Sequence, residues 1–178
     1  MIFYSGFSLK EDKHFFDKLL VDSDFCIAGF SYGAIKAFHK TEMLLKDGKR
    51  VDRLQLFSPA FFQTKLLKFK KLQLKAYGLN EQNYIQNFLK LCFKPYVEQK
   101  VENVTTSKLE LEELLFYEWD KNRLEALVNK GVKIEVYLGS EDKVIDVDGA
   151  RKFFKEFATV TYIKNKNHFL KGKELCQV

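Results

Sequence analysis

The stretch FCIAGFSYGAI, residues 25–35, decides the fold that we expect. Its first residues are apolar up to Gly29 and are typical of a short buried strand, whereas the apolar residues from Ala34 onward recur at helical spacing. The Gly-x-Ser-x-Gly motif centred on Ser31 is therefore expected on a sharp turn from a strand into a helix. Such a turn exposes the serine hydroxyl above the sheet, and the first amides of the helix point to where negative charge develops during acyl transfer.

Length and composition favour one domain over residues 1–178. Of these residues 46% are hydrophobic, which is enough for a sizeable core. No apolar run reaches the roughly 18 residues of a membrane-spanning helix, and the first residues lack the pattern of a signal peptide, so we expect a cytoplasmic protein with no membrane partner. The cysteines lie too far apart to suggest a disulfide framework or a zinc site and are expected to be reduced: Cys26, Cys92 and Cys176.

The net charge of +6 comes from one segment. Residues 61–100 contain eight lysines, no arginine and only two acidic residues, so the rest of the chain is neutral. A solvated face would explain these lysines, but their confinement to one segment favours an acidic partner, and the lack of arginine argues against nucleic acid. In a helix over residues 64–75, four of them would form a stripe about 120° wide, the lysine stripe: Lys65, Lys68, Lys71 and Lys75.

Strand and helix patterns alternate along the chain, which predicts an α/β fold with a mostly parallel sheet. Besides the strand before Ser31, strands are expected at residues 2–4, 51–57, 132–138 and 160–163. Helical spacing is found at residues 15–20, from Ala34 to near Gly48, and at residues 150–157. Residues from about 61 to 130 form an almost wholly helical insertion into this pattern.

Three residues of types that often take part in catalysis each follow a predicted strand: Ser31, Asp142 and His168. The carboxyl ends of parallel strands share one edge of the sheet, where sites usually lie. His168 is the best-placed histidine because His14 and His39 fall on predicted helices. Taken singly, each of the three is more often a turn or surface residue, but their order together favours a catalytic triad.

The acid is less narrowly defined than the serine and the histidine. Glu141, Asp146 and Asp148 are close neighbours of Asp142 in the sequence and remain alternatives to it. The Gly-x-x-Asp spacing after the strand favours Asp142.

This order of serine, late acid and final histidine resembles the α/β-hydrolase superfamily. The resemblance covers residues 1–60 and 131–178 and leaves about 61–130 as the variable helical cap. It implies a minimal α/β-hydrolase core in which Ser31 is the nucleophile, His168 the general base and later acid, and Asp142 the group that orients the histidine. No metal ion or organic cofactor is implied.

The resemblance further implies an oxyanion hole formed by the backbone amides of Phe7 and Tyr32. Two departures from the family pattern are visible: only one helix is expected before the nucleophile strand, and Ser5 stands where a histidine is usual. An acyl pocket under the cap would draw on phenylalanines of the insertion: Phe61, Phe62, Phe69, Phe88 and Phe93.

Among short α/β-hydrolases, the chain resembles the pimeloyl-acyl carrier protein methyl ester esterases of biotin synthesis. The compact length, the Gly29–Gly33 motif and the basic cap carry this resemblance. It implies hydrolysis of the terminal methyl ester of a pimeloyl chain on an acidic acyl carrier protein, which would dock on the lysine stripe. The alternatives are a general short-chain carboxylesterase, an acyl-carrier thioesterase, or a non-catalytic binding module with the same fold.

Overall fold

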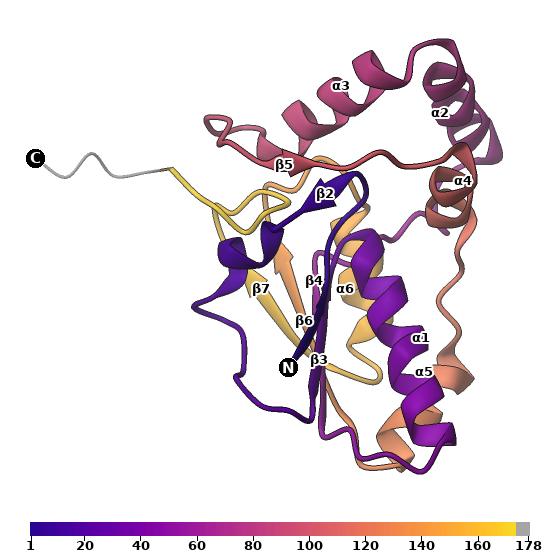
Figure 1. The fold of residues 1–178 in the computed structure, drawn as a ribbon, viewed down its shortest axis with the longest axis vertical. Helices are drawn as coiled ribbons and strands as arrows, with labels where there is room; N and C mark the ends of the chain where they lie inside the picture. Colours follow the sequence, from indigo (N-terminus) through magenta and orange to yellow (C-terminus); the bar gives the residue numbers. More distant parts are fainter. Residues whose placement is uncertain (174–178) are drawn as a thin grey trace, which may run out of the picture.

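The computed structural model describes residues 1–173, which are built around a five-stranded parallel sheet (Figure 1). Cys176 lies outside these residues. None of the helices in the described part of the chain combines the length and hydropathy needed to span a membrane. The strands lie side by side in sequence order: β1 (Ile2–Tyr4), β3 (Cys26–Phe30), β4 (Arg53–Phe57), β6 (Lys133–Gly139) and β7 (Thr159–Ile163). All neighbours are parallel, as predicted, so their carboxyl ends share one edge.

Helices α1 (Tyr32–Lys46), α5 (Lys121–Asn129) and α6 (Val147–Phe154) pack on one face of the sheet. The buried indole of Trp119 joins them, because it contacts Phe38 of α1 and stands 5.0 Å, centroid to centroid, from the ring of Phe154 in α6. The end of α1 was expected near Gly48. That glycine takes a left-handed φ of 71° and closes the helix through a hydrogen bond to Leu45.

Three further helices stand over the carboxyl edge of the sheet: α2 (Leu67–Leu79), α3 (Glu81–Phe93) and α4 (Lys108–Phe116) (Figure 1). We call these helices and their connections the cap. The last helix of the predicted insertion, α5, lies beside α1 instead, where Arg123 forms an ion pair with Glu42. It is thus part of the layer that covers the sheet, and leads directly into β6.

The helix predicted at residues 15–20 is not formed. A short 3-10 helix, η1 (Asp12–Phe16), ends before Leu19. The amides of Leu19 and Leu20 still donate to the carbonyl of Phe16, at 2.8 Å and 3.0 Å, so the chain keeps one turn after η1. The side chain of Gln55 then accepts a hydrogen bond from the amide of Val21 at 2.9 Å and donates one to the carbonyl of Leu19 at 3.0 Å, where a longer helix would continue.

A two-stranded antiparallel ribbon was not predicted from the sequence. It pairs β2 (Leu9–Lys10) with β5 (Glu102–Asn103) and so joins the loop after β1 to the chain that returns from α3. Strands this short carry no readable alternation pattern, which is why sequence reasoning missed them.

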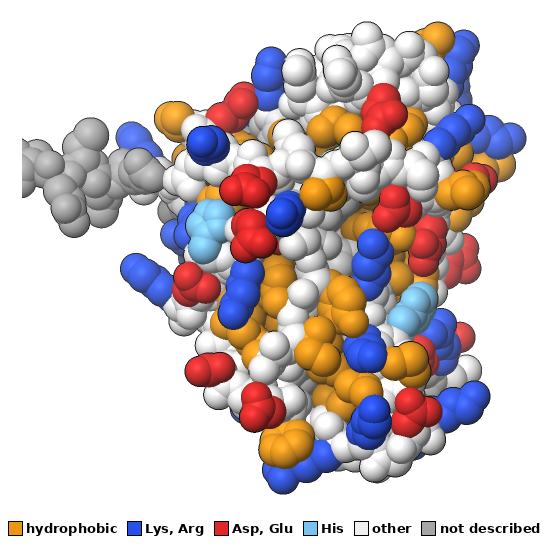
Figure 2. All heavy atoms as spheres, in the orientation of Figure 1, with side chains coloured by type: hydrophobic (Ala, Val, Ile, Leu, Met, Phe, Trp, Pro, Cys, Tyr) orange, Lys and Arg blue, Asp and Glu red, His pale blue; other side chains and the backbone are white. Residues whose placement is uncertain are grey.

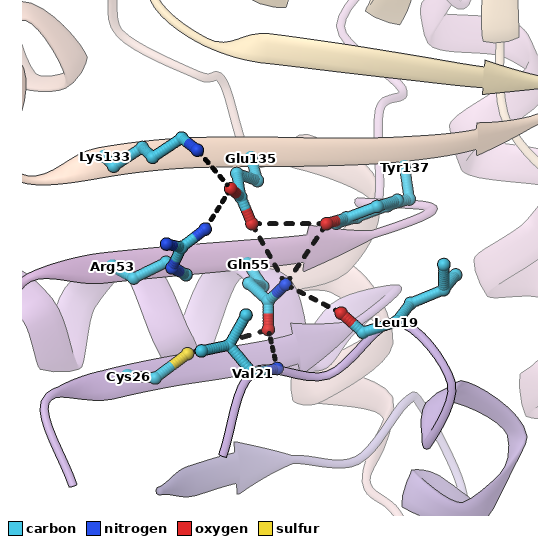
Figure 3. A network of polar contacts seen from close by, with 8 residues as sticks. All are labelled: Leu19, Val21, Cys26, Arg53, Gln55, Lys133, Glu135 and Tyr137. Carbon is cyan, nitrogen blue, oxygen red and sulfur yellow. Dashed lines mark hydrogen bonds and ion pairs between the residues drawn. The ribbon is translucent and has the colours of Figure 1, made fainter. Parts of the chain in front are cut away.

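The sheet face opposite α1 carries a polar network between β4 and β6 (Figure 3). Glu135, itself buried, accepts hydrogen bonds from Gln55 at 3.1 Å and from Tyr137 at 3.2 Å. It also pairs with Arg53 and with Lys133, whose ammonium nitrogen stands 2.9 Å from the carboxylate. Every side chain of this cluster has a partner, so we assign it a structural role.

The network predicts a pH dependence of stability. Burial acts to raise the pKa of Glu135, but the hydrogen bond from Lys133 and the charge of Arg53 outweigh it and lower that pKa. A lowered pKa in the folded state means that the carboxylate stabilises the fold above its unfolded pKa of about 4.3, and that this contribution is lost as the pH falls through the folded value. Glu135→Gln is therefore expected to be less stable than the wild type at neutral pH, by a margin that narrows on acidification.

Urea denaturation between about pH 7 and about pH 3 measures this margin. Glu156→Gln serves as the control, because Glu156 pairs with Lys121 in a half-exposed ion pair that should contribute little. A margin for Glu135→Gln that does not change with pH would contradict the assignment.

Candidate active site

Ser31 lies at the turn between β3 and α1, in a backbone conformation that is rare for a residue with a side chain. Its φ is 53° and its ψ is −115°. Glycine is required on both sides: a Cβ at Gly29 would lie 2.2 Å from the carbonyl oxygen of Gly33, and one at Gly33 would lie 2.1 Å from that of Tyr4. The turn is therefore the close strand-to-helix approach that the motif predicts.

Asp142 and His168 are brought together from the loops after β6 and β7. The Nδ1 atom of His168 lies 2.6 Å from Oδ2 of Asp142, and both side chains are fully buried. The other carboxylate oxygen accepts hydrogen bonds from the amides of Val144 at 2.8 Å and Ile145 at 3.3 Å. A proton on Nδ1 then leaves the Nε2 lone pair free, and within residues 1–173 this nitrogen has no hydrogen-bond partner.

Two of the three neighbouring carboxylates, those of Asp146 and Glu141, bond to other groups. Asp146 caps the N-terminus of α6 through the amide of Gly149 and accepts a hydrogen bond from Thr64 at 2.7 Å. Glu141 pairs with exposed Lys143. Of the acids weighed from the sequence, Asp142 is the one whose hydrogen bond to the histidine the structure shows. The catalytic roles of these residues stay predictions.

The loop that carries His168 is held from several sides. The side-chain amide of buried Asn167 donates to the carbonyl of Phe93, at the end of α3, at 2.8 Å. The hydroxyl of Ser58 donates to the carbonyl of His168 at 2.8 Å. The imidazole ring lies 4.9 Å from the ring of Phe30, which directly precedes Ser31. The histidine thus lies beside the turn of Ser31, and no sequence pattern marked Asn167 as part of its support.

The two amides predicted to form the oxyanion hole belong to segments that meet at this turn. Tyr32 is the first residue of α1, so its amide has no partner within the helix. Phe7 lies in the loop after β1, and its ring packs against that of Tyr32 at 6.4 Å between centroids. The loop runs close to α1, because a Cβ at Gly33 would lie 2.5 Å from the carbonyl oxygen of Ser5.

A narrow apolar cleft lies between the cap and the core. Its volume is about 40 Å³, and Val144, whose amide bonds to Asp142, is one of its walls. A wider cavity of about 280 Å³ between α2 and α3 shares several walls with it: Gln73, Tyr84, Phe88 and Leu91. An apolar chain entering between the cap helices would therefore run toward the loop of the predicted acid.

The predicted phenylalanine lining is correct for three residues and wrong for two. Phe62, Phe69 and Phe88 line the narrow cleft. Phe61 is instead buried against Phe153 and Phe154 of α6, and Phe93 stacks on Phe169, next to the histidine. Phe61 precedes the cap and Phe93 is the last residue of α3, and both side chains are buried in the core.

Three lysines of the stripe lie on the exposed face of α2. Lys68, Lys71 and Lys75 line a shallow groove of about 380 Å³ together with Leu67 and Leu72, which are 54% and 53% exposed. Figure 2 shows basic and hydrophobic side chains side by side at the upper right, where α2 lies.

The fourth lysine of the stripe is placed differently, because the predicted helix at residues 64–75 begins only at Leu67. Lys65 lies in the turn before α2, with its ammonium nitrogen 5.9 Å from the ring centre of Phe69. Lys70 of the same segment faces inward, over the ring of Phe116. The exposed basic face of α2 is thus narrower than the sequence predicted.

Neither a scan against protein-family profiles nor a search of curated proteins finds a match to this sequence. Solved structures do match it. BioG from Haemophilus influenzae aligns with a TM-score of 0.54 at 12% identity over 95% of this chain and 88% of that protein. E-2-(acetamidomethylene)succinate hydrolase aligns with a TM-score of 0.55 at 12% identity, over 94% and 84% of the two chains.

A monoacylglycerol lipase from Paleococcus ferrophilus aligns with a TM-score of 0.51 at 9% identity, over 94% of this chain and 84% of the lipase. The chain spans only about half of two other matching structures from Bacillus subtilis, 54% of one and 56% of the other, a naproxen esterase. At such identities the likeness shows a common fold alone.

Proposed function

We propose, on the premise that this chain has the α/β-hydrolase fold, that it hydrolyses a carboxylic ester through an acyl intermediate on Ser31. The observation that carries the proposal is the buried hydrogen bond between Asp142 and His168, beside the strained turn of Ser31. Within residues 1–173 the Nε2 atom of His168 has no hydrogen-bond partner, the Ser31 hydroxyl included, so its lone pair is available to act as the general base that engages the serine when substrate is bound.

The reaction follows from this arrangement in two steps. In the first, Nε2 of His168 takes the proton of the Ser31 hydroxyl as the serine oxygen attacks the ester carbonyl, and the amides of Phe7 and Tyr32 donate to the oxyanion. The C–O bond to the alcohol then breaks, and His168 returns the proton to the leaving oxygen. In the second step, water deprotonated by His168 attacks the acyl-enzyme and frees the acid and Ser31.

For the substrate we propose the methyl ester of a pimeloyl chain bound to an acidic acyl carrier protein. The apolar cleft together with the wider cavity that shares its walls suits an unbranched acyl chain, and the basic face of α2 suits an acidic protein that also presents apolar side chains to Leu67 and Leu72. The likeness in fold to BioG is consistent with this proposal.

The test compares three substrates: the carrier-bound pimeloyl methyl ester, a small soluble ester, and a carrier-bound acyl thioester. Much faster cleavage of the first supports the proposal. Preference for the small ester would favour a general carboxylesterase, and release of the acyl chain from the carrier would favour a thioesterase. No turnover of any of them, together with no reaction of Ser31 with a fluorophosphonate, would favour a binding module.

Charge reversal on α2 tests the docking surface. Lys68→Glu combined with Lys71→Glu is expected to raise the KM for the carrier-bound ester about tenfold and to leave the small ester unaffected, because only the carrier meets this face. Added salt should likewise raise the KM of the wild type for the carrier-bound ester and so weaken its preference for that ester over the small one.

The matched control reverses two exposed lysines at the far end of α1, Lys46→Glu and Lys49→Glu. An equal loss with both pairs of substitutions, or an equal loss on both substrates, would rule out docking on α2.

A further inference from the structure

The loop that carries Phe7 is held at Gly6, the residue before Phe7, by hydrogen bonds to both the amide and the carbonyl of this glycine. The amide of Gly6 donates to Oδ2 of Asp12 at 2.8 Å, and its carbonyl accepts from the amide of Leu9 at 3.2 Å. The Gly6 carbonyl and the Phe7 amide belong to one planar trans peptide group. The Leu9 amide, by holding this carbonyl, fixes the direction of the Phe7 N–H, which points the opposite way, and Asp12 holds the preceding peptide group, between Ser5 and Gly6.

Stability alone does not account for a carboxylate at Asp12. This residue of η1 is 1% exposed, and in the described part of the chain its Oδ1 has no hydrogen-bond partner. Burial raises the pKa of Asp12, and hydrogen bonds from the Gly6 amide, the Ser5 side chain and its own amide act against that rise. A buried carboxylate with one unpaired oxygen costs the fold free energy, whereas its hydrogen bond to the Gly6 amide holds the loop that carries Phe7.

The remainder of the loop is held by the cap. The amide of Val104 donates to the carbonyl of Ser8 at 3.1 Å, and the hydroxyls of Ser8 and Thr106 lie 2.7 Å apart. Among the described residues, Asp12 is thus the residue whose side chain bonds to the loop backbone before Phe7, at Gly6.

We propose that Asp12 is a positioning residue, which acts through Gly6 to aim the Phe7 amide at the carbonyl oxygen of the substrate. This rests on the proposed function, because the Phe7 amide is an oxyanion donor only where Ser31 is the nucleophile. Asp12 itself touches no substrate. Its effect should appear in the transition state, where the oxyanion develops, rather than in substrate binding.

The test compares Asp12→Ala, which removes the acceptor, with Asp12→Asn, which keeps an acceptor oxygen without the charge. Asp12→Ala is expected to lower kcat about 10- to 100-fold with KM within about twofold, and to slow fluorophosphonate labelling of Ser31 by a similar factor. Asp12→Asn is expected to recover kcat and the labelling rate to within about threefold of the wild type. Asp12→Val replaces the alanine variant should that one not fold.

Leu124→Ala in α5 is the control for lost stability, since it leaves a core cavity remote from this loop. The inference is overturned if alanine and asparagine at position 12 behave alike, if KM alone changes, or if Leu124→Ala lowers kcat as much as Asp12→Ala. In each of these cases the proposed function still stands, provided that the wild type hydrolyses the ester. A wild type that neither turns over ester nor reacts with the fluorophosphonate ends both proposals together.

Discussion

Ser31→Ala is expected to lower kcat for ester hydrolysis by about 10⁶-fold and to abolish labelling by a fluorophosphonate. The alanine keeps the strained turn but removes the oxygen that attacks the carbonyl. It should fold, because the bonds that place the turn are made by the backbone: the amide of residue 31 donates to Phe57 and its carbonyl accepts from Ala34 and Ala60. Steady-state kinetics and intact-protein mass spectrometry after labelling measure the two effects.

The control is Ser23→Ala, in the turn before β3 at the opposite end of the sheet. The Ser23 hydroxyl accepts only a local hydrogen bond from the amide of Phe25. This variant should keep its activity and its adduct on Ser31. A fluorophosphonate adduct on the Ser31→Ala protein, or residual turnover close to that of the wild type, would place the nucleophile elsewhere.

Asp142→Asn is expected to lower kcat about 10⁴-fold while the loop around it stays in place. An asparagine oxygen can still accept from the amides of Val144 and Ile145, as Oδ1 does now. Its NH₂ group would then face Nδ1 of His168, from which the carboxylate accepts a hydrogen bond in the wild type. The imidazole would be driven to carry its proton on Nε2, the atom that must take the serine proton, and its charged form would lose its counter-ion.

Asp146→Asn is the matched control four residues away. Asparagine also serves as an N-cap, so the bond to Gly149 is retained and kcat should stay within about threefold. Stability measured by urea denaturation should be similar for both variants. If the position 146 variant were the damaged one, the acid of the site would be Asp146, which the sequence left open as an alternative.

Much of this fold could be predicted because its signals are local. The alternation of residues 132–138 predicts β6, and the change from an apolar run to helical spacing around Ser31 predicts both β3 and the start of α1. Glycine on either side of the serine has a steric reason that the structure bears out. In each case a few consecutive residues carry the physical requirement.

Predictions failed where a partner distant in sequence decides the conformation. The pattern at residues 15–20 is helical, but no such helix is formed, and the side chain of Gln55 bonds to the backbone of Leu19 and Val21. Phe61 and Phe93 are as apolar as Phe62, and only the folded position of each residue decides whether its side chain lies in the core or lines the cleft. The ribbon of β2 and β5 depends on pairing across 92 residues and leaves no trace in either segment.

The sequence by itself determined the order of the five strands of the sheet and the turn that presents Ser31, because periodicity and glycine content act over a few residues. Only the tertiary structure decided which carboxylate meets His168 and which side chain holds the loop of Phe7. Asp142 is 26 residues from His168, and Asp12 reaches back to Gly6 across a change in chain direction. Hydrogen bonds of this kind depend on the position of both atoms in space, which the chain acquires only when the sheet and the cap have closed around them.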